Sequence, residues 1–171
     1  MYSLLALESQ RLSIEPCRSL IALFWFLAVA PPLLAQAPEW FGTWRLNLEK
    51  SVYQPGPAPY KRATMKVERV DGKVRFSYDF VHLRGGVQHL EWTGSFDGKD
   101  YIVQGADEYI TYAYKQTADR AYDIVAKADG RVAAVATATL SSDGRTLTTV
   151  TRRKNSLGQD LTTTTVHEKV H

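Results

Sequence analysis

Five polar side chains occur among apolar and aromatic residues, where they could contact a small molecule. A phenol, a guanidinium or an imidazole can orient a ligand whose remaining surface is held by apolar side chains. These candidate ligand-binding residues are Tyr78, Tyr112, Tyr122, Arg152 and His167. The chemistry that they favour is non-covalent binding of a small hydrophobic or amphipathic molecule.

Metal and cofactor chemistry is not indicated by the residue pattern. A zinc site needs three or four converging nitrogen, oxygen or sulfur ligands. The histidines are His82, His89, His167 and His171. Their spacing forms no recognisable ligand set, and Gly85-Gly86 precedes no helical pattern that could receive a phosphate. We therefore expect no metal and no cofactor.

Catalytic motifs are not evident either. The chain contains no G-x-S-x-G nucleophile motif. Its paired carboxylates, Asp107-Glu108 and Asp97 with Asp100, fall near turns, where carboxylates usually bond to the local backbone. The residues therefore favour binding over catalysis, and an enzyme that uses a pocket is kept as an alternative.

The charge pattern argues against nucleic acid as a partner. The chain has 21 Lys and Arg against 18 Asp and Glu, a net charge of +3. Its basic runs, Arg152-Arg153-Lys154 and Lys61-Arg62, are short. Nucleic-acid binding needs a continuous basic face, whereas runs this short usually lie at solvated strand ends.

Tight-turn signals recur about every 9 to 14 residues after residue 70 and divide the chain into short segments. The turn signals are Asp71-Gly72, Gly85-Gly86, Asp97-Gly98, Gly105-Ala106-Asp107, Ala118-Asp119, Asp129-Gly130, Asp143-Gly144 and Asn155 to Gly158. Regular turns between alternating segments predict consecutive antiparallel hairpins. A meander of this length must close into a barrel or pack as a sandwich.

Ten segments alternate apolar and polar residues in the manner of half-buried strands. They cover residues 39–50, 63–70, 73–81, 87–96, 100–104, 109–116, 120–128, 131–140, 145–153 and 161–170. In 73–81, for example, Val74, Phe76, Tyr78 and Phe80 share one face. In the first segment, Trp44, Leu46 and Leu48 are expected together. The pattern predicts an all-β fold, a single antiparallel meander β-barrel of about 8–10 strands.

Two threonine-rich segments favour closure over an open sheet. Residues 146–151 and 162–166 combine threonine with valine or leucine and carry no charge. Exposed edges of this composition would invite aggregation. Pairing the last strand with the first removes both edges.

Two features bear on whether the barrel is hollow. Pro55, Pro57 and Pro59 forbid a helix in residues 51–59, which predicts an extended loop across one end. The alanines at positions 133, 134, 136 and 138 would leave room beside the aromatic faces. A barrel filled by its own side chains is the alternative.

The first 37 residues have the pattern of a secretory signal peptide. Arg11 and Arg18 precede the apolar run 20–30, which is too short to span a bilayer. Cleavage is expected near Ala35 or Ala37, leaving a domain of residues 38–171 that lacks Cys17, the only cysteine. We expect a secreted protein, most simply periplasmic and bacterial, without a membrane span after cleavage; an uncleaved anchor is the alternative.

Gly42-Thr43-Trp44, placed on the first strand of a single meander, resembles the calycin superfamily of lipocalins and fatty-acid-binding proteins. The wider pattern is similar to small secreted bacterial lipocalin-like proteins of unassigned role. The resemblance implies that Gly42 and Trp44 form a plug at the closed end of the barrel, with Arg152 or Arg153 stacked on the tryptophan. It also implies that Arg152 could engage a ligand carboxylate. The proline loop departs from the fatty-acid-binding branch, which has two helices there.

The leading functional hypothesis is carriage or binding of a small hydrophobic or amphipathic molecule inside the barrel. The first alternative is a structural or interaction module of the cell envelope with a filled barrel. The second alternative is an enzyme. A cavity with identified lining residues would separate the first two.

Overall fold

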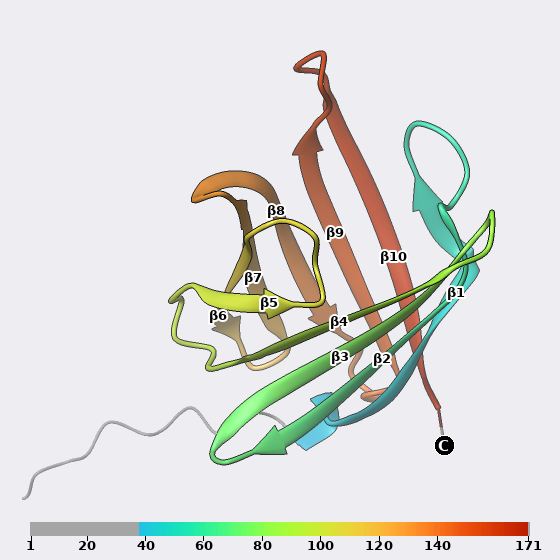
Figure 1. Cartoon of the computed structure of the whole chain (residues 1–171). Coiled ribbons are helices and arrows are strands. Elements are labelled where there is room, and N and C mark those ends of the chain that lie inside the picture. Colours follow the sequence, from blue (N-terminus) through green and yellow to red (C-terminus); the bar gives the residue numbers. More distant parts are fainter. Residues whose placement is uncertain (1–37, 171) are drawn as a thin grey trace, which may run out of the picture. The chain divides into compact units, whose positions relative to one another are not determined.

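The structure, a computed structural model, describes residues 38–170 as one antiparallel β-barrel (Figure 1). The predicted signal segment lies outside the described residues. A short 3₁₀ helix, η1 (Pro38–Trp40), precedes ten strands. They are β1 (Gly42–Tyr53), β2 (Tyr60–Val70), β3 (Lys73–His82), β4 (Val87–Gly94), β5 (Tyr101–Gln104), β6 (Ile110–Ala118), β7 (Ala121–Ala128), β8 (Arg131–Leu140), β9 (Thr146–Lys154) and β10 (Asp160–Val170). In this part of the chain, no helix is long and apolar enough to cross a membrane.

Each strand pairs with its neighbour in sequence, and β10 pairs with β1 to close the barrel. This confirms the predicted all-β meander of ten strands and its closure. The loop after β1 contains no helix, as the prolines require. One end of the barrel carries η1 and the turns after β2, β4, β6 and β8. The other end carries the proline loop and the turns after β3, β5, β7 and β9.

The two-residue hairpins form where Asp-Gly pairs interrupt the alternation. Asp71 and Gly72 have φ values of 50° and 76°, and Asp129 and Gly130 have 49° and 76°. Positive φ at both central residues gives the turn whose twist matches that of the flanking strands. These turns set the register of β2 with β3 and of β7 with β8, and therefore which side chains face inward.

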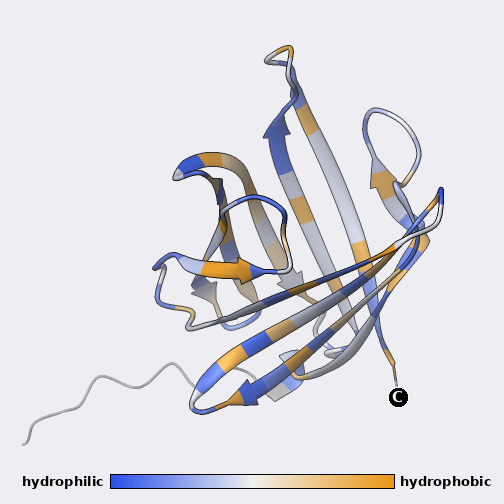
Figure 2. Cartoon of the chain, viewed as in Figure 1, coloured by the Kyte–Doolittle hydropathy of each residue, from blue (hydrophilic) through white to orange (hydrophobic). Residues whose placement is uncertain are grey.

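Hydrophobic and hydrophilic residues alternate along several strands (Figure 2). The buried residues are mainly aromatic and aliphatic. On β3, Val74 and Phe76 are buried, whereas Lys73 is exposed. On β8, Ala134, Ala136 and Ala138 face inward, but Ala133 is exposed. Ala133 therefore leaves no room inside the barrel, because it has the opposite parity.

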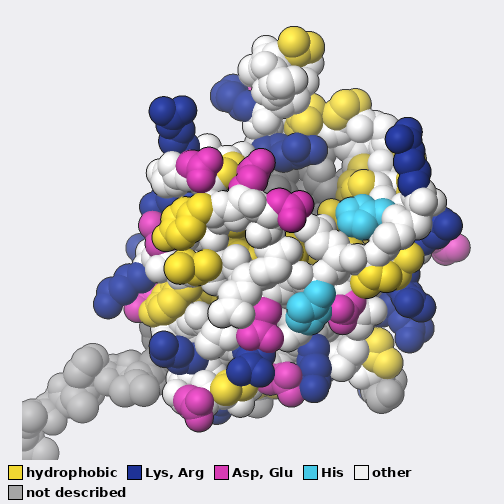
Figure 3. Space-filling model, in the orientation of Figure 1, with side chains coloured by type: hydrophobic (Ala, Val, Ile, Leu, Met, Phe, Trp, Pro, Cys, Tyr) yellow, Lys and Arg dark blue, Asp and Glu magenta, His cyan; other side chains and the backbone are white. Residues whose placement is uncertain are grey.

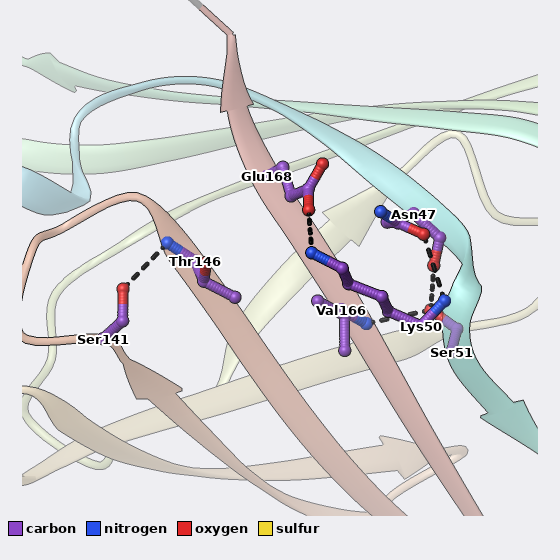
Figure 4. A network of polar contacts seen from close by, with 7 residues as sticks. All are labelled: Asn47, Lys50, Ser51, Ser141, Thr146, Val166 and Glu168. Carbon is purple, nitrogen blue, oxygen red and sulfur yellow. Dashed lines mark hydrogen bonds and ion pairs between the residues drawn. The ribbon is translucent and has the colours of Figure 1, made fainter.

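The closing seam between β1 and β10 contains a bulge after Asn47, where the pairing register shifts. The Ser51 hydroxyl donates to the Asn47 carbonyl (2.6 Å) and accepts a hydrogen bond from the Val166 amide (3.0 Å). At the protein surface, the Lys50 ammonium on β1 donates to the Glu168 carboxylate on β10 at 2.7 Å (Figure 4). Ser51 thus supplies a partner for a β10 amide that the interrupted ladder would leave unpaired.

The same bulge makes the prediction for Leu48 wrong. Trp44 and Leu46 are buried as expected, but Leu48 is 37% exposed. Across the bulge, the pairing advances five residues along β1 but two along β10. Because this difference is odd, the inward parity of β1 reverses beyond it. Strict alternation cannot show where such an insertion falls.

Replacing Gly105 with alanine tests the close approach of β4 and β5. Gly105 and Gly130 have similar φ values, +81° and +76°. A Cβ on Gly105 would overlap the His89 carbonyl oxygen, whereas a Cβ on Gly130 meets nothing within 4 Å. Gly105→Ala is expected to lower the free energy of unfolding by about 1–3 kcal/mol more than Gly130→Ala, measured by urea denaturation. Equal losses would contradict the close approach.

Candidate ligand-binding cavity

The two halves of the barrel interior differ in packing. The half next to η1 is filled by large side chains that contact one another. This packed group, called the plug below, consists of Trp40, Trp44, Trp92, Phe96, Tyr122 and Leu140 with their neighbours. The opposite half contains a cavity.

Trp44 lies at the centre of the plug and is fully buried. Its indole N–H donates to the Trp40 carbonyl (3.0 Å), which ties η1 to the first strand. The Lys169 ammonium lies 5.1 Å from the centre of the Trp44 ring and donates to the Glu39 carbonyl (2.6 Å). Lys169 therefore occupies the position over the tryptophan that was predicted for Arg152 or Arg153. Those two arginines pair with Thr162 and Leu161, at the other end of β10.

Gly42 is explained by the same lysine. Its φ is +131°, and a Cβ at this position would lie 2.9 Å from the Lys169 Cε atom. Glycine thus lets the lysine stem pass across β1 to reach η1. In the G-x-W motif of this chain, Trp44 is a plug residue and Gly42 leaves the space that the Lys169 side chain needs above it.

Tyr122 belongs to the plug and not to the cavity. Its ring packs edge-on against Trp40 (4.4 Å between ring centroids) and against Phe96 (4.3 Å). Its hydroxyl is buried and has no hydrogen-bond partner among the described residues. Burial raises the pKa of this phenol to about 12, so it stays protonated.

The cavity has a volume of about 650 Å³. Apolar and aromatic side chains form most of its wall: Leu46, Met65, Phe80, Leu90, Ile124 and Leu147, with Tyr78, Tyr112 and Tyr114. Pro55, Pro57 and Pro59 also line it, so the proline loop borders the cavity at the end opposite the plug. Lys and Arg, Asp and Glu, histidine and apolar side chains all lie around the hollow at this end (Figure 3).

A line of polar side chains crosses the cavity wall on β9 and β10. Thr151 is the register partner of Thr163, and Thr149 is the partner of Thr165. Arg153 continues the line toward the rim, and His167 continues it toward the plug. We call these six lining residues the polar stripe. The stripe provides hydroxyl, guanidinium and imidazole groups on one side of an otherwise apolar space.

His167 is the innermost member of the polar stripe. Its neighbours across the two adjacent strands are Leu46 and Leu147. The Nδ1 atom is buried without a hydrogen-bond partner in the described part of the chain. Desolvation lowers the pKa of this imidazole from 6.5 to about 4. The ring is therefore neutral at pH 7 and presents one donor and one acceptor nitrogen.

Tyr78 and Tyr114 join their hydroxyls at 3.1 Å on the opposite wall. Burial raises the pKa of both phenols, so neither carries charge at neutral pH. The pairing satisfies each hydroxyl without a charged partner. Phe76 stacks on Tyr114 (5.1 Å between ring centroids) and continues this aromatic wall into the plug.

Three of the five predicted polar contacts line the cavity: Tyr78, Tyr112 and His167. Tyr122 lies in the plug, and Arg152 is exposed on the outer face of β9. Arg153, one residue further, faces the cavity instead. The four threonines of the polar stripe were not predicted as lining residues. The alternation of Leu147, Thr149, Thr151 and Arg153 indicates one inward face of β9. The opposite face is also rich in threonine, so the sequence does not show which face lies inside.

The cavity wall contains no Asp or Glu side chain among the described residues. Asp97 accepts hydrogen bonds from the Lys99 amide (3.1 Å) and the Tyr101 hydroxyl (3.0 Å), away from the cavity. No group of three His, Cys, Asp or Glu residues in the described chain could hold a metal ion. The groups that reach the cavity can donate and accept hydrogen bonds, and one of them is cationic.

The fold and the cavity together define a class: a ten-strand meander β-barrel with a tryptophan plug at one end and a hollow at the other. A scan of protein families finds no match to the chain, and a search of curated proteins also finds none. Among solved structures, the barrel is similar to a zebrafish ileal bile acid-binding protein complexed with cholic acid. The two are 9% identical, with a TM-score of 0.47, over 77% of this chain and 99% of that one.

Proposed function

We propose that the protein binds a small hydrophobic or amphipathic molecule inside the barrel. The observation that carries this proposal is the cavity of about 650 Å³ at the end opposite the plug. Its volume lies within the range of pockets that hold small organic ligands, and its wall is mainly apolar with a few polar groups. Moving the apolar surface of a ligand from water into such a cavity is favourable, which is the driving force for binding.

The cavity favours a carrier over the alternative of a filled barrel. Side chains fill the plug half, where Trp44 and Trp92 are fully buried. In the other half, most inward residues of β8 to β10 are alanines and threonines, whose short side chains leave space in front of the aromatic wall opposite. An enzymatic role gains less support, because among residues 38–170 the cavity lining includes no carboxylate and a single histidine, which is neutral.

We also propose that the protein is a lipocalin-like member of the calycin superfamily, exported to the bacterial periplasm. The support for export is the signal-peptide pattern of residues 1–37. N-terminal sequencing of protein recovered from the periplasm of an expressing bacterium should begin after Ala35 or Ala37. Recovery of the uncut chain in the membrane fraction would contradict export in soluble form.

Filling the cavity is expected to abolish ligand binding. Ala136 lines the cavity, whereas Ala133 on the same strand faces outward. Ala136→Trp should weaken binding of a fluorescent fatty-acid probe at least about tenfold, because the indole occupies the space of the ligand. Ala133→Trp should leave the affinity unchanged. The probe's own emission measures both affinities, and thermal unfolding checks that both variants fold.

Two outcomes would contradict the proposed function. The first is a wild-type protein that does not bind the probe at high micromolar concentration. The second is equal binding by the Ala136→Trp and Ala133→Trp variants, which would place the probe outside the barrel.

A further inference from the structure

The polar stripe divides the cavity into two chemically different sides. Its threonines come from the facing pairs Thr151–Thr163 and Thr149–Thr165 on β9 and β10. The wall formed by β3, β4 and β6 is aromatic and aliphatic, with its two deepest hydroxyls, on Tyr78 and Tyr114, bonded to each other. A ligand that fits both sides carries its polar groups along one side only.

Charge is also unequally distributed along the polar stripe. Arg153, near the rim, is the only ionised side chain among the described lining residues at neutral pH. Burial raises the pKa of the phenol of Tyr60, another lining residue, and the positive charge of Arg153 opposes part of that rise. At the inner end, His167 is neutral and stands between two leucines. Arg153 therefore stabilises an anionic group near the rim. At the inner end, no cationic side chain of the described lining could do so.

The cost of desolvation decides which groups fit each end. A carboxylate buried next to a neutral imidazole would lose its hydration without gaining a counter-ion. An uncharged hydroxyl at the same place loses less, and one hydrogen bond to the imidazole offsets that loss. Conversely, a purely alkyl end would leave the His167 imidazole without a partner.

We propose that the ligand is an amphipathic monoacid whose acid group lies at Arg153 and whose inner end carries an uncharged hydrogen-bonding group at His167. This inference rests on the proposed function, because it requires a ligand in the cavity. Hydroxyl or carbonyl groups along one side of such a molecule would meet the threonines of the polar stripe. The chemical class is a hydroxylated or oxidised lipid acid rather than a plain alkyl acid.

The inner end is tested with two acids that differ in one hydroxyl, palmitate and ω-hydroxypalmitate, as competitors of the fluorescent probe. The measured quantity is the ratio of their affinities. His167→Leu is expected to lower the affinity for ω-hydroxypalmitate about tenfold relative to the affinity for palmitate, because the hydroxyl loses its buried partner. His167→Gln, which keeps a donor and an acceptor, should retain most of the wild-type ratio. A ratio unchanged by His167→Leu overturns the assignment of the inner end.

The rim is tested with palmitate and its uncharged analogue, hexadecanol. Arg153→Gln is expected to lower the affinity for palmitate about three- to tenfold relative to the affinity for hexadecanol. The effect is modest because the guanidinium is exposed. Arg152→Gln is the matched control, since Arg152 faces outward, and should leave the ratio unchanged. Equal effects of the two substitutions overturn the assignment of Arg153, because they indicate only a long-range charge effect.

These outcomes are separate from failure of the proposed function. If neither acid, the alcohol nor the probe binds the wild-type protein, the carrier function itself is wrong. If all of them bind and substitution of His167 or Arg153 leaves both affinity ratios unchanged, the protein is a carrier and only the ligand class is wrong.

Discussion

Replacing Trp44 with alanine should lower the free energy of unfolding by about 3–5 kcal/mol, the usual loss for a large aromatic residue in a packed core. Trp44 is fully buried, and its indole N–H bonds to the Trp40 carbonyl at 3.0 Å. The substitution also leaves the Lys169 ammonium without the ring below it. Urea denaturation followed by circular dichroism measures the loss.

Two control variants separate packing from hydrogen bonding. Trp44→Phe keeps most of the apolar contact but removes the N–H donor, so it should cost about 1–2 kcal/mol. Leu157→Ala, at a position 80% exposed, should change stability by less than about 0.5 kcal/mol. A loss below about 1 kcal/mol for Trp44→Ala would show that the plug does not hold the closed end of the barrel.

The strand plan of this barrel could be predicted from the sequence because two local signals agree. Alternation along 73–81 places Phe76 inside, and the Asp71-Gly72 turn before it sets the register. Each signal concerns residues close together in the chain, so neither depends on knowledge of the distant strands. Closure followed from a different argument, the aggregation risk of two uncharged threonine-rich edges.

The site could be predicted only in part, since inward direction near strand ends depends on parity. Arg152 and Arg153 differ by one position, and the structure turns Arg153 into the cavity. Local sequence does not distinguish them, because both faces of β9 are rich in threonine. The bulge after Asn47 creates the same uncertainty for Leu48. A one-residue shift reverses every later assignment on a strand.

The cover of Trp44 could not be inferred at all from spacing. Lys169 reaches the ring only because β10 pairs with β1, where it is the register partner of Trp44. Trp40 was likewise outside the predicted plug, although it supplies the carbonyl that Trp44 bonds. The Lys169 contact depends on closure of the barrel, which brings the two ends of the described chain together. The Trp40 bond is local, between residues four apart, but strand alternation gives no signal for it.

Hollow and filled halves arise from the same strands with different residues. The inner residues of β8 pass from Ala134 and Ala136 at the cavity to Ala138 and Leu140 in the core. Near the plug, the inward threonines give way to Leu147 on β9 and to His167 on β10. On these three strands the small residues lie at the middle of the cavity and larger ones lie toward the plug, while the wall opposite is aromatic. The cavity is the space left where small residues face that wall.

Acidification should destabilise the folded protein between about pH 6.5 and pH 4 through His167. In the folded state, burial lowers the pKa of this imidazole to about 4, while the unfolded chain keeps the ordinary value of 6.5. Over this interval the unfolded state binds more protons than the folded state, so unfolding becomes easier as pH falls. A difference of roughly 2.5 pKa units corresponds to about 3 kcal/mol. Below about pH 4, both states are protonated and His167 adds no further loss.

His167→Gln isolates this contribution, because glutamine keeps hydrogen-bonding groups but does not titrate. The His167 ring faces Leu46 and Leu147 in the adjacent strands, so no carboxylate beside it in the ladder can offset its charge. The stability difference between wild type and variant should fall by about 3 kcal/mol from pH 7.5 to pH 4, measured by urea denaturation at each pH. Parallel pH profiles for the two proteins would show that the imidazole accepts a proton in the folded barrel as easily as in water. The inner end of the cavity would then be hydrated, which would also remove the reason for an uncharged ligand group there.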